Sequence, residues 1–447
     1  MVAISALAVS VIKVSMIIPV FNGAENLRSC LAKLREVING EVQIVIVDDG
    51  STDESFVVAS EFARNFENVV LHKISDNKGV GNARNVGIGL SVGTYIYFLD
   101  CDDTVIGDFL EGLDSAWRNK TDLILTPIQR SSSEKINASF LSLLEQSVKK
   151  EREDLLSAVL QHEAWPVQCW GYFIRREFLI HNQIRFEPIR KSEDMAFITS
   201  VFLQLQTYAI VSEPVYVHNR RPGSLGKTFS EHEIKSWFLA FVKVARLAEH
   251  YSMRSFEGAI LSNQLTYALS SFLIAFMLAD FTSKKEFINK ISDDGSIIYL
   301  VRLASLDSNE NIEPDEVLSA LLAVSSVSIK KTIGDIGSGR NYLYCYEWLS
   351  IGVYISLTSL NFTIDGIIDD NVELTTPNQE LGLYPVPPTI CKGKFPPQST
   401  VVVCHDKQRV FISKMDYLKD DRESGLKVVH LTTKDFVGEV PVQVFFK

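Results

Sequence analysis

The sequence predicts an α/β fold for the first part of this chain. Short apolar segments alternate with amphipathic stretches between Val14 and Asp103, which is the pattern of repeated β-α-β units. Such repeats form a mainly parallel sheet with helices on both faces. Polar residues follow each apolar segment directly, so several strand ends are expected to meet in one crevice at the carboxyl edge of the sheet.

The expected elements follow from these periodicities in chain order. Strands are expected over 14–20, 42–47, 69–72 and 95–99, and helices over 25–37, 53–66 and 79–90. Short strands are expected at 123–126 and 215–218, and an apolar helical stripe begins at residue 231. From residue 330 a new alternation predicts a strand with a glycine turn at 330–339, a helix over 341–349, and strands over 362–368 and 401–404.

The length of 447 residues predicts more than one domain. We expect an α/β domain over 1–230, a helical region over 231–328 and a small α/β domain over 329–447. Hydrophobic residues make up 46% of the chain and charged residues 22%, which is typical of a packed globular protein.

Charge and cysteine content narrow the classes of partner and compartment. A net charge of -11 argues against a nucleic-acid partner. The six cysteines form no C-x-x-C pair and no regular spacing, which favours a reducing cytoplasm over a disulfide framework.

Two apolar segments bear on membrane association. Residues 1–12 lack a basic start, so a leader or first helix packed on the domain is expected there, not a signal peptide. Residues 258–279 carry no charge but contain six polar side chains, which favours a buried bundle helix over a membrane span. Peripheral contact with the inner face of a cell membrane is left open.

Three carboxylates end the fourth expected strand in the run Phe98-Leu99-Asp100-Cys101-Asp102-Asp103. Two Asp residues at positions i and i+2 at a strand end can share one divalent cation and its phosphate-bearing ligand. A D-x-D pair alone is weak evidence, so the interpretation depends on its surroundings.

Four blocks in order, 17–23, 44–53, 77–87 and 98–103, together resemble the family 2 glycosyltransferases of the GT-A fold. The resemblance extends to about residue 228. It implies a nucleotide-sugar donor and Mn²⁺ or Mg²⁺, which favour carboxylate ligands and neutralise a leaving diphosphate.

The resemblance also assigns the donor side of the site. It implies that Asp100 lies near the donor ribose and Asp102 binds the metal, while Asp103 has no fixed role. It implies further donor contacts by Pro19, Val20 and Phe21 around the base, by Asp48 to uracil and by Arg84 beside the nucleotide. For Asp48-Asp49-Gly50-Ser51 the alternative is a strand-ending turn, and Asp53 is expected to be a helix cap.

The acceptor side of the resemblance lies further along the chain. A Trp170 block is followed by Glu193-Asp194, which corresponds to the family's catalytic pair, with Asp194 as general base and Glu193 orienting it. An Asp at a helix N-terminus is held charged, although a simple capping pair is the alternative. Arg220 and Arg221 are expected to bind the diphosphate, and His218 is either a metal ligand or a structural residue.

The last expected domain resembles small Rossmann-like domains attached to bacterial sugar-modifying enzymes. It offers Gly337-Ser338-Gly339 and Asp369-Asp370-Asn371, but Tyr342 replaces the third glycine of a dinucleotide fingerprint. A structural or protein-contact role is therefore favoured over binding of NAD or a nucleotide.

These observations predict an inverting, metal-dependent glycosyltransferase. It would move a sugar from a nucleoside diphosphate donor, with UDP as the favoured nucleotide, to a hydroxyl of a glycan or lipid-linked glycan. The family resemblance implies bacterial surface-polysaccharide synthesis. The alternatives are a nucleotide-sugar-binding regulatory or scaffold protein, a nucleotidyltransferase, and an oxidoreductase acting through the last domain.

Overall fold

The computed structural model describes residues 11–35, 39–106, 110, 113–130, 151–161, 168–189, 192–211, 216–219, 231–279, 281–292, 299, 341–344, 366–368, 385–386, 400–404 and 427–431. The chain divides into two compact units. The N-terminal unit comprises residues 1–224 and 254–260, and the second unit comprises residues 225–253 and 261–447.

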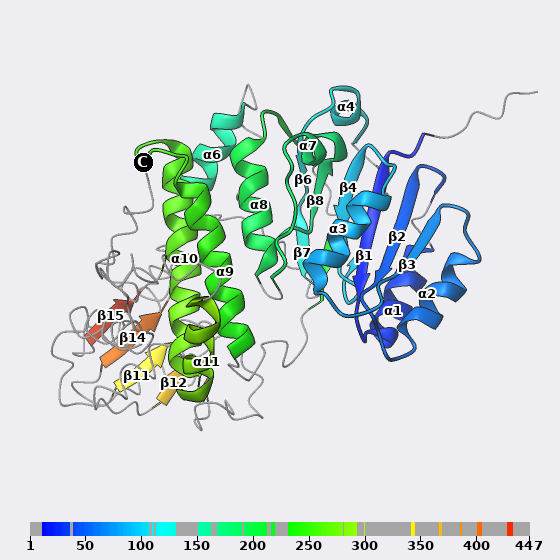
Figure 1. Ribbon diagram of the computed structural model, residues 1–447. Helices are drawn as coiled ribbons and strands as arrows, with labels where there is room; N and C mark the ends of the chain where they lie inside the picture. The colour runs from blue at the N-terminus through cyan, green and yellow to red at the C-terminus, as the bar shows by residue number, and fades with distance from the viewer. Residues whose placement is uncertain are drawn as a thin grey trace, which may run out of the picture. The chain divides into compact units, whose positions relative to one another are not determined.

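A seven-stranded mixed sheet forms the centre of the N-terminal unit, with strand order β3-β2-β1-β4-β8-β6-β9 (Figure 1). The strands are β1 (Val14–Val20), β2 (Val42–Asp48), β3 (Val69–Lys73), β4 (Tyr95–Phe98), β6 (Leu123–Leu125), β8 (Tyr172–Arg175) and β9 (Tyr208–Ile210). Strands β1 to β4 run parallel, whereas β8 runs antiparallel to both neighbours, β4 and β6. The expected α/β fold is confirmed, and the first four strands agree with their predicted ranges to within one residue.

Helices cover both faces of this sheet because alternate side chains of each strand enter two different cores. Met16 and Ile18 of β1 pack in the core that α1 and α2 complete, while Ile17 packs in the core that α3 and α8 complete. The helices of the unit are α1 (Ala24–Leu34), α2 (Ser55–Ala63), α3 (Val80–Leu90), α4 (Leu113–Arg118), α6 (Arg152–Gln161), α7 (Arg176–His181) and α8 (Glu193–Gln204).

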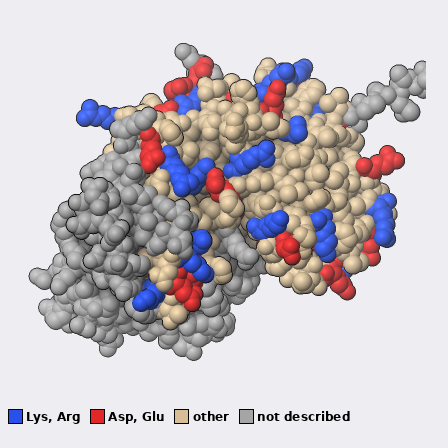
Figure 2. All heavy atoms as spheres, in the orientation of Figure 1, with Lys and Arg blue, Asp and Glu red and all other residues tan. Residues whose placement is uncertain are grey.

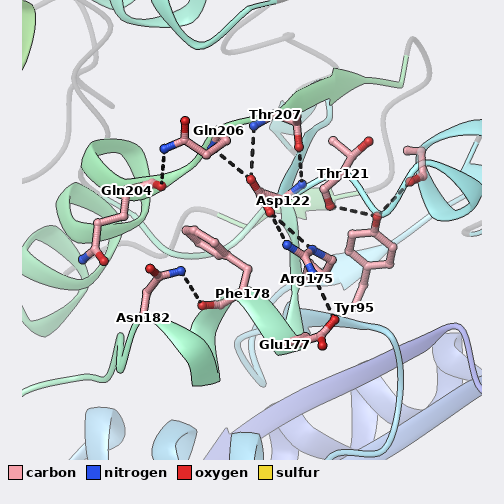
Figure 3. Close-up of polar contacts among 11 residues, drawn as sticks. Tyr95, Thr121, Asp122, Arg175, Glu177, Phe178, Asn182, Gln204, Gln206 and Thr207 are labelled. Carbon is pink, nitrogen blue, oxygen red and sulfur yellow. Dashed lines mark hydrogen bonds and ion pairs between the residues drawn. The ribbon is translucent and has the colours of Figure 1, made fainter.

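The buried carboxylate of Asp122, just before β6, connects this strand to β8 and β9 (Figure 3). Its Oδ1 accepts hydrogen bonds from Nε and Nη2 of Arg175 at the end of β8, at 3.2 and 2.5 Å. Its Oδ2 accepts from the backbone N–H groups of Gln206 and Thr207, just before β9, at 2.9 and 3.1 Å. One charged group therefore fixes β6, β8 and β9 against one another.

A second, three-stranded sheet has the order β5-β10-β7. Its strands are β5 (Thr104–Val105), β7 (Ile128–Arg130) and β10 (Tyr216–His218). Because β5 follows the acidic run directly and pairs antiparallel with β10, the end of β10 lies beside the carboxylates of that run.

Three helices follow, α9 (Glu231–Ala248), α10 (Phe256–Leu278) and α11 (Phe281–Ser292). Phe238, Phe272 and Phe287 are fully buried with ring centroids 5.3 to 5.7 Å apart, so aromatic packing holds α9, α10 and α11 together. The helical content expected from residue 231 is confirmed for the described part. No described helix combines the length and apolar character needed to cross a membrane.

A five-stranded parallel sheet of the second unit has the order β13-β12-β11-β14-β15. Its strands are β11 (Asn341–Tyr344), β12 (Gly366–Ile368), β13 (Pro385–Val386), β14 (Thr400–Cys404) and β15 (Lys427–Leu431). The helix expected over 341–349 is wrong for 341–344, because the run Asn-Tyr-Leu-Tyr forms a strand paired on both sides. The glycines at 337–339 and the carboxylates at 369 and 370 lie outside the described residues.

Candidate functional site

The carboxyl ends of β1, β2 and β4 meet at one edge of the sheet, as the sequence predicted. Val20 is paired with Asp48 in the β1/β2 ladder, and Ile17 is paired with Phe98 in the β1/β4 ladder. Pro19 and Val20 are buried, whereas 46% of Phe21 is exposed. The residues expected around a nucleobase, and Asp48, thus lie on adjacent strands with one aromatic ring open to solvent.

Asp48 is a fully buried carboxylate with one unused acceptor. Its Oδ1 accepts a hydrogen bond from the backbone N–H of Ser51 at 3.0 Å. No hydrogen bond reaches Oδ2 from the described residues, and the Lys73 ammonium lies 3.6 Å away. Buried carboxylate oxygens are rarely left without a donor, so Oδ2 is suited to accept from a ligand.

The neighbouring carboxylates have structural tasks instead. Asp49 accepts from the backbone N–H groups of Lys78 and Gly79 at 3.0 and 2.8 Å and so caps the start of α3. Asp53 accepts from Ser55 N–H at 2.9 Å and from Ala24 N–H at 3.1 Å, at the starts of α2 and α1. Asp53 lies one residue before Glu54, the N-cap residue of α2, and so bonds the first N–H of the helix from outside the cap position.

The acidic run after β4 forms a compact group. Asp100, Asp102 and Asp103 each offer a carboxylate oxygen, and these atoms lie within 4.8 Å of one another. Oxygen ligands at this spacing are the donor set that Mg²⁺ or Mn²⁺ prefers.

Asp103 is committed to protein contacts within that group. Its Oδ1 accepts from the Asn219 backbone N–H at 2.7 Å, and its Oδ2 accepts from the Tyr216 hydroxyl. Burial raises the pKa of Asp103 to about 7, although both hydrogen bonds lower it. The Asn219 side chain also donates to the Asp102 carbonyl at 2.8 Å, so this contact fixes β10 to the acidic run.

Arg84, in the middle of α3, joins the acidic run to α8. Its Nη2 donates to Asp100 at 2.8 Å, and its Nη1 donates to Glu193 at 2.7 Å and to Asp194 at 2.5 Å. Only 3% of the Arg84 side chain is exposed. Burial by itself lowers the pKa of Arg84, but Asp194, Asp100 and Glu193 outweigh it and raise that pKa well above its ordinary value.

Glu193 and Asp194 occupy the first turn of α8. Gly81 permits their approach to α3, since a Cβ at this position would lie 3.1 Å from the Glu193 Cγ. Burial, and then the Asp194 charge, raise the pKa of Glu193 to about 8, although Arg84 lowers it. Burial likewise raises the pKa of Asp100 against the lowering effect of Arg84. With its pKa at about 8, Glu193 keeps its proton near neutral pH.

The remaining predicted residues fall into two cases. His218 ends β10, and its ring stacks on Trp170 with centroids 5.1 Å apart; the compact acidic group found among the described residues does not include it. Arg220 and Arg221 lie outside the described residues.

Sequence reasoning missed the roles of Tyr216, Asn219 and Trp170. Trp170 stacks on Tyr216 as well as on His218, with ring centroids 4.6 Å apart, beside the Tyr216–Asp103 hydrogen bond. The sequence marked the segments around Trp170 and Tyr216, but nothing in it signalled that they pair with each other.

Residues 15–181 match the family described as Glycosyl transferase family 2. The match covers less than half of the chain. The matched range includes Asp48, Arg84, Asp100 and Asp102, and it ends before Glu193. The ends of β1, β2 and β4 described above lie within the matched range.

Similar proteins agree with this match. The chain is 30% identical over 218 residues to the uncharacterized glycosyltransferase EpsJ of Bacillus subtilis, covering 47% of this chain and 62% of EpsJ. It is 27% identical over 234 residues to the minor teichoic acid biosynthesis protein GgaB of Bacillus subtilis, covering 50% of this chain and 25% of GgaB. The chain thus spans less than two thirds of each of these relatives.

The structure also resembles a solved structure. A crystal structure of residues 1–349 of S. aureus TarS in complex with UDP-GlcNAc matches with a TM-score of 0.50 and 18% identity, covering 73% of this chain and 95% of that one. The likeness identifies the fold as a GT-A-like α/β fold.

Proposed function

We propose that this protein is an inverting glycosyltransferase that moves a sugar from a nucleoside diphosphate, UDP in the first place, to a hydroxyl group of a bacterial surface glycan. The observation that carries the proposal is the convergence of Asp100, Glu193 and Asp194 on Arg84. The Asp102 carboxylate lies within 4.8 Å of that of Asp100. The carboxylate expected near the sugar donor and the carboxylate expected to act as general base then belong to one site. The named role of GgaB in teichoic acid biosynthesis supports the choice of acceptor class.

Asp48 and Phe21 are proposed to bind the nucleobase of the sugar donor. The unused Oδ2 of Asp48 can accept the imide N–H of uracil, and the exposed ring of Phe21 offers a flat apolar contact to the base. The Lys73 ammonium lies 3.6 Å from Oδ2, beyond hydrogen-bonding distance, so this oxygen can still accept a hydrogen bond from a ligand.

The carboxylates proposed to lie near the diphosphate are suitable ligands for Mn²⁺ or Mg²⁺. Asp102 would hold the cation with Asp100 beside it toward the ribose, since Asp103 already accepts two hydrogen bonds from the protein. Such a cation neutralises charge that develops on the leaving diphosphate. His218 as a further ligand and Arg220 and Arg221 as diphosphate contacts are parts of the proposal that rest on the sequence alone.

Asp194 is proposed as the general base. It takes the proton of the acceptor hydroxyl while the acceptor oxygen bonds to the sugar C1 and the bond from C1 to the diphosphate oxygen breaks. A single displacement of this kind inverts the anomeric carbon. Burial and the Asp194 charge raise the pKa of Glu193, so Glu193 is the weaker candidate for accepting a proton from the acceptor, and Asp194 is proposed for that role.

A ligand screen tests this proposal. Thermal unfolding is measured with UDP-, GDP-, CDP- and dTDP-sugars, with and without Mn²⁺. We expect a UDP-sugar with Mn²⁺ to give the largest rise in Tm, because saturation at 100 times Kd stabilises the folded state by about 2.7 kcal/mol. Asp102→Ala is expected to abolish the Mn²⁺-dependent part.

The control variant is Asp114→Ala, which removes a carboxylate whose side chain is 67% exposed and bound to Lys13. It should leave the ligand shift unchanged. Product analysis separates the alternatives: UDP release supports glycosyl transfer, pyrophosphate release indicates a nucleotidyltransferase, and binding without turnover by wild type and Asp194→Asn alike indicates a sensor or scaffold. A Tm unaffected by every nucleotide-sugar contradicts the proposal.

A further inference from the structure

Arg84 is almost fully enclosed by protein, and Nε is its one guanidinium nitrogen without a hydrogen-bond partner among the described residues. Both terminal nitrogens donate to carboxylates, and Nη1 serves Glu193 and Asp194 together. The guanidinium carbon lies 5.3 Å from the ring centroid of Phe186. Phe186 is itself stacked on Phe197 of α8, with centroids 3.9 Å apart, so the same packing fixes the helix that carries Asp194.

These contacts connect two consecutive elements, α3 and β4, to α8, which follows more than a hundred residues later. Arg84 is in α3, Asp100 follows β4, and Asp194 is in the first turn of α8. Because arginine presents a rigid planar fork, it can hold two carboxylates from different elements at a fixed separation, which a lysine ammonium on a flexible stem cannot do.

We infer that Arg84 is a positioning residue, which holds the Asp194 carboxylate in place by tying α8 to Asp100 and does not itself bind the nucleotide. The inference rests on the proposed function, because it assumes that Asp194 accepts the proton of the acceptor. It revises the position beside the nucleotide that the sequence implied for Arg84. A contact with the diphosphate would require Arg84 to leave Glu193, which is buried with it, and the partly buried Asp100 and Asp194, at an electrostatic cost.

Arg84→Lys tests the inference, since it keeps the charge and removes the fork. The measured quantities are kcat and KM for UDP release from the UDP-sugar that the wild type turns over, with water as the acceptor, and Kd for UDP with Mn²⁺. We expect kcat to fall about 100-fold, within the range that a general base contributes. We expect KM and Kd to stay within about threefold of wild type, because uniform binding is not lost.

Arg175→Lys is the matched control. It alters another partly buried arginine, paired with Asp122 at 2.5 Å in the same unit, and should lower Tm without a comparable loss of kcat. A double-mutant cycle gives a second test. In the Asp194→Asn background, Arg84→Lys should change kcat by less than about threefold, because the effects of substitutions at residues that act as a unit are not additive.

The inference is overturned if Arg84→Lys raises Kd for UDP at least tenfold with kcat retained, or if the losses of Arg84→Lys and Asp194→Asn multiply. A crystal structure of the wild type with UDP and Mn²⁺ decides the matter should the lysine variant fail to fold: Arg84 stays bonded to Asp194 if the inference holds and contacts UDP if it does not. A wild type without turnover contradicts the proposed function, and the crystal structure still decides the contact of Arg84.

Discussion

Glu193 is the residue whose protonation depends most clearly on the fold. Its side chain is 7% exposed, lies next to Asp194 and shares Arg84 with it. Burial and the Asp194 charge raise its pKa to about 8 from an ordinary value of 4.5. Between those two values the folded protein holds a proton that the unfolded chain has released, so the free energy of unfolding falls as pH rises through this window.

Glu193→Gln should remove this pH dependence, because a glutamine cannot ionise but its Oε1 can still accept from Arg84. Each proton contributes at most about 1.4 kcal/mol per pH unit to the slope. We expect urea unfolding at pH 5, 6.5 and 8 to give a flatter free-energy curve for the variant, with the two proteins most alike near pH 5.

The control for this measurement is Glu177→Gln. Glu177 pairs with Arg175 on the surface, where its side chain is 77% exposed. This variant should keep the slope of the wild type. Parallel curves for wild type and Glu193→Gln contradict the raised pKa of Glu193.

Helix α3 has to lie close to β1 for Arg84 to reach the carboxylates, and glycines make this possible. A Cβ on Gly87 would lie 2.4 Å from the Cγ2 of Ile17, whereas a Cβ on Gly89 would have nothing within 4 Å. The two positions are two residues apart on one helix, so they share the same helix propensity and differ in packing.

Alanine at these two positions should change stability in opposite directions. Gly87→Ala overpacks the contact with Ile17 and is expected to destabilise by about 1–3 kcal/mol. Gly89→Ala should stabilise by about 0.5–1 kcal/mol, because alanine loses less backbone entropy than glycine. Urea unfolding of both variants checks this, and an equal effect at both positions contradicts the close packing of α3 on β1.

At the scale of elements, local pattern was sufficient where neighbours in sequence are neighbours in space. The β-α-β region from Val14 to Phe98 has strong alternation, and each polar cluster at a strand end follows directly from it. The strand at Asn341–Tyr344 was mistaken for a helix because short apolar runs fit either period, and pairing on both sides decides the outcome.

Contacts across long sequence separations could not be predicted. Arg84 was singled out, but its bonds to Glu193 and Asp194 cross more than a hundred residues. The bond from Tyr216 to Asp103 likewise depends on the pairing of β5 with β10, which no residue pattern announces. Residue types therefore indicated the chemistry of the site, while the tertiary fold determines which groups neutralise one another.

At the scale of the whole molecule, every described residue of the proposed site belongs to the N-terminal unit. Asp48, Arg84, Asp100, Asp102 and Asp194 all lie within residues 1–224. The five-stranded parallel sheet of the second unit contributes none of them. Donor binding should therefore stabilise the amides of one unit and leave that sheet unaffected.

Hydrogen exchange with and without UDP and Mn²⁺ checks this expectation. We expect slower exchange in peptides that contain the ends of β1, β2 and β4 and the first turn of α8, because binding to the folded state suppresses the local opening from which amides exchange. Peptides containing Thr400–Cys404 or Lys427–Leu431 should exchange at unchanged rates. In Asp102→Ala the Mn²⁺-dependent protection should disappear from the ends of β1, β2 and β4 and from the first turn of α8. Protection that appears instead in β14 and β15 would indicate that UDP binds to the second unit and would contradict the assignment of the site.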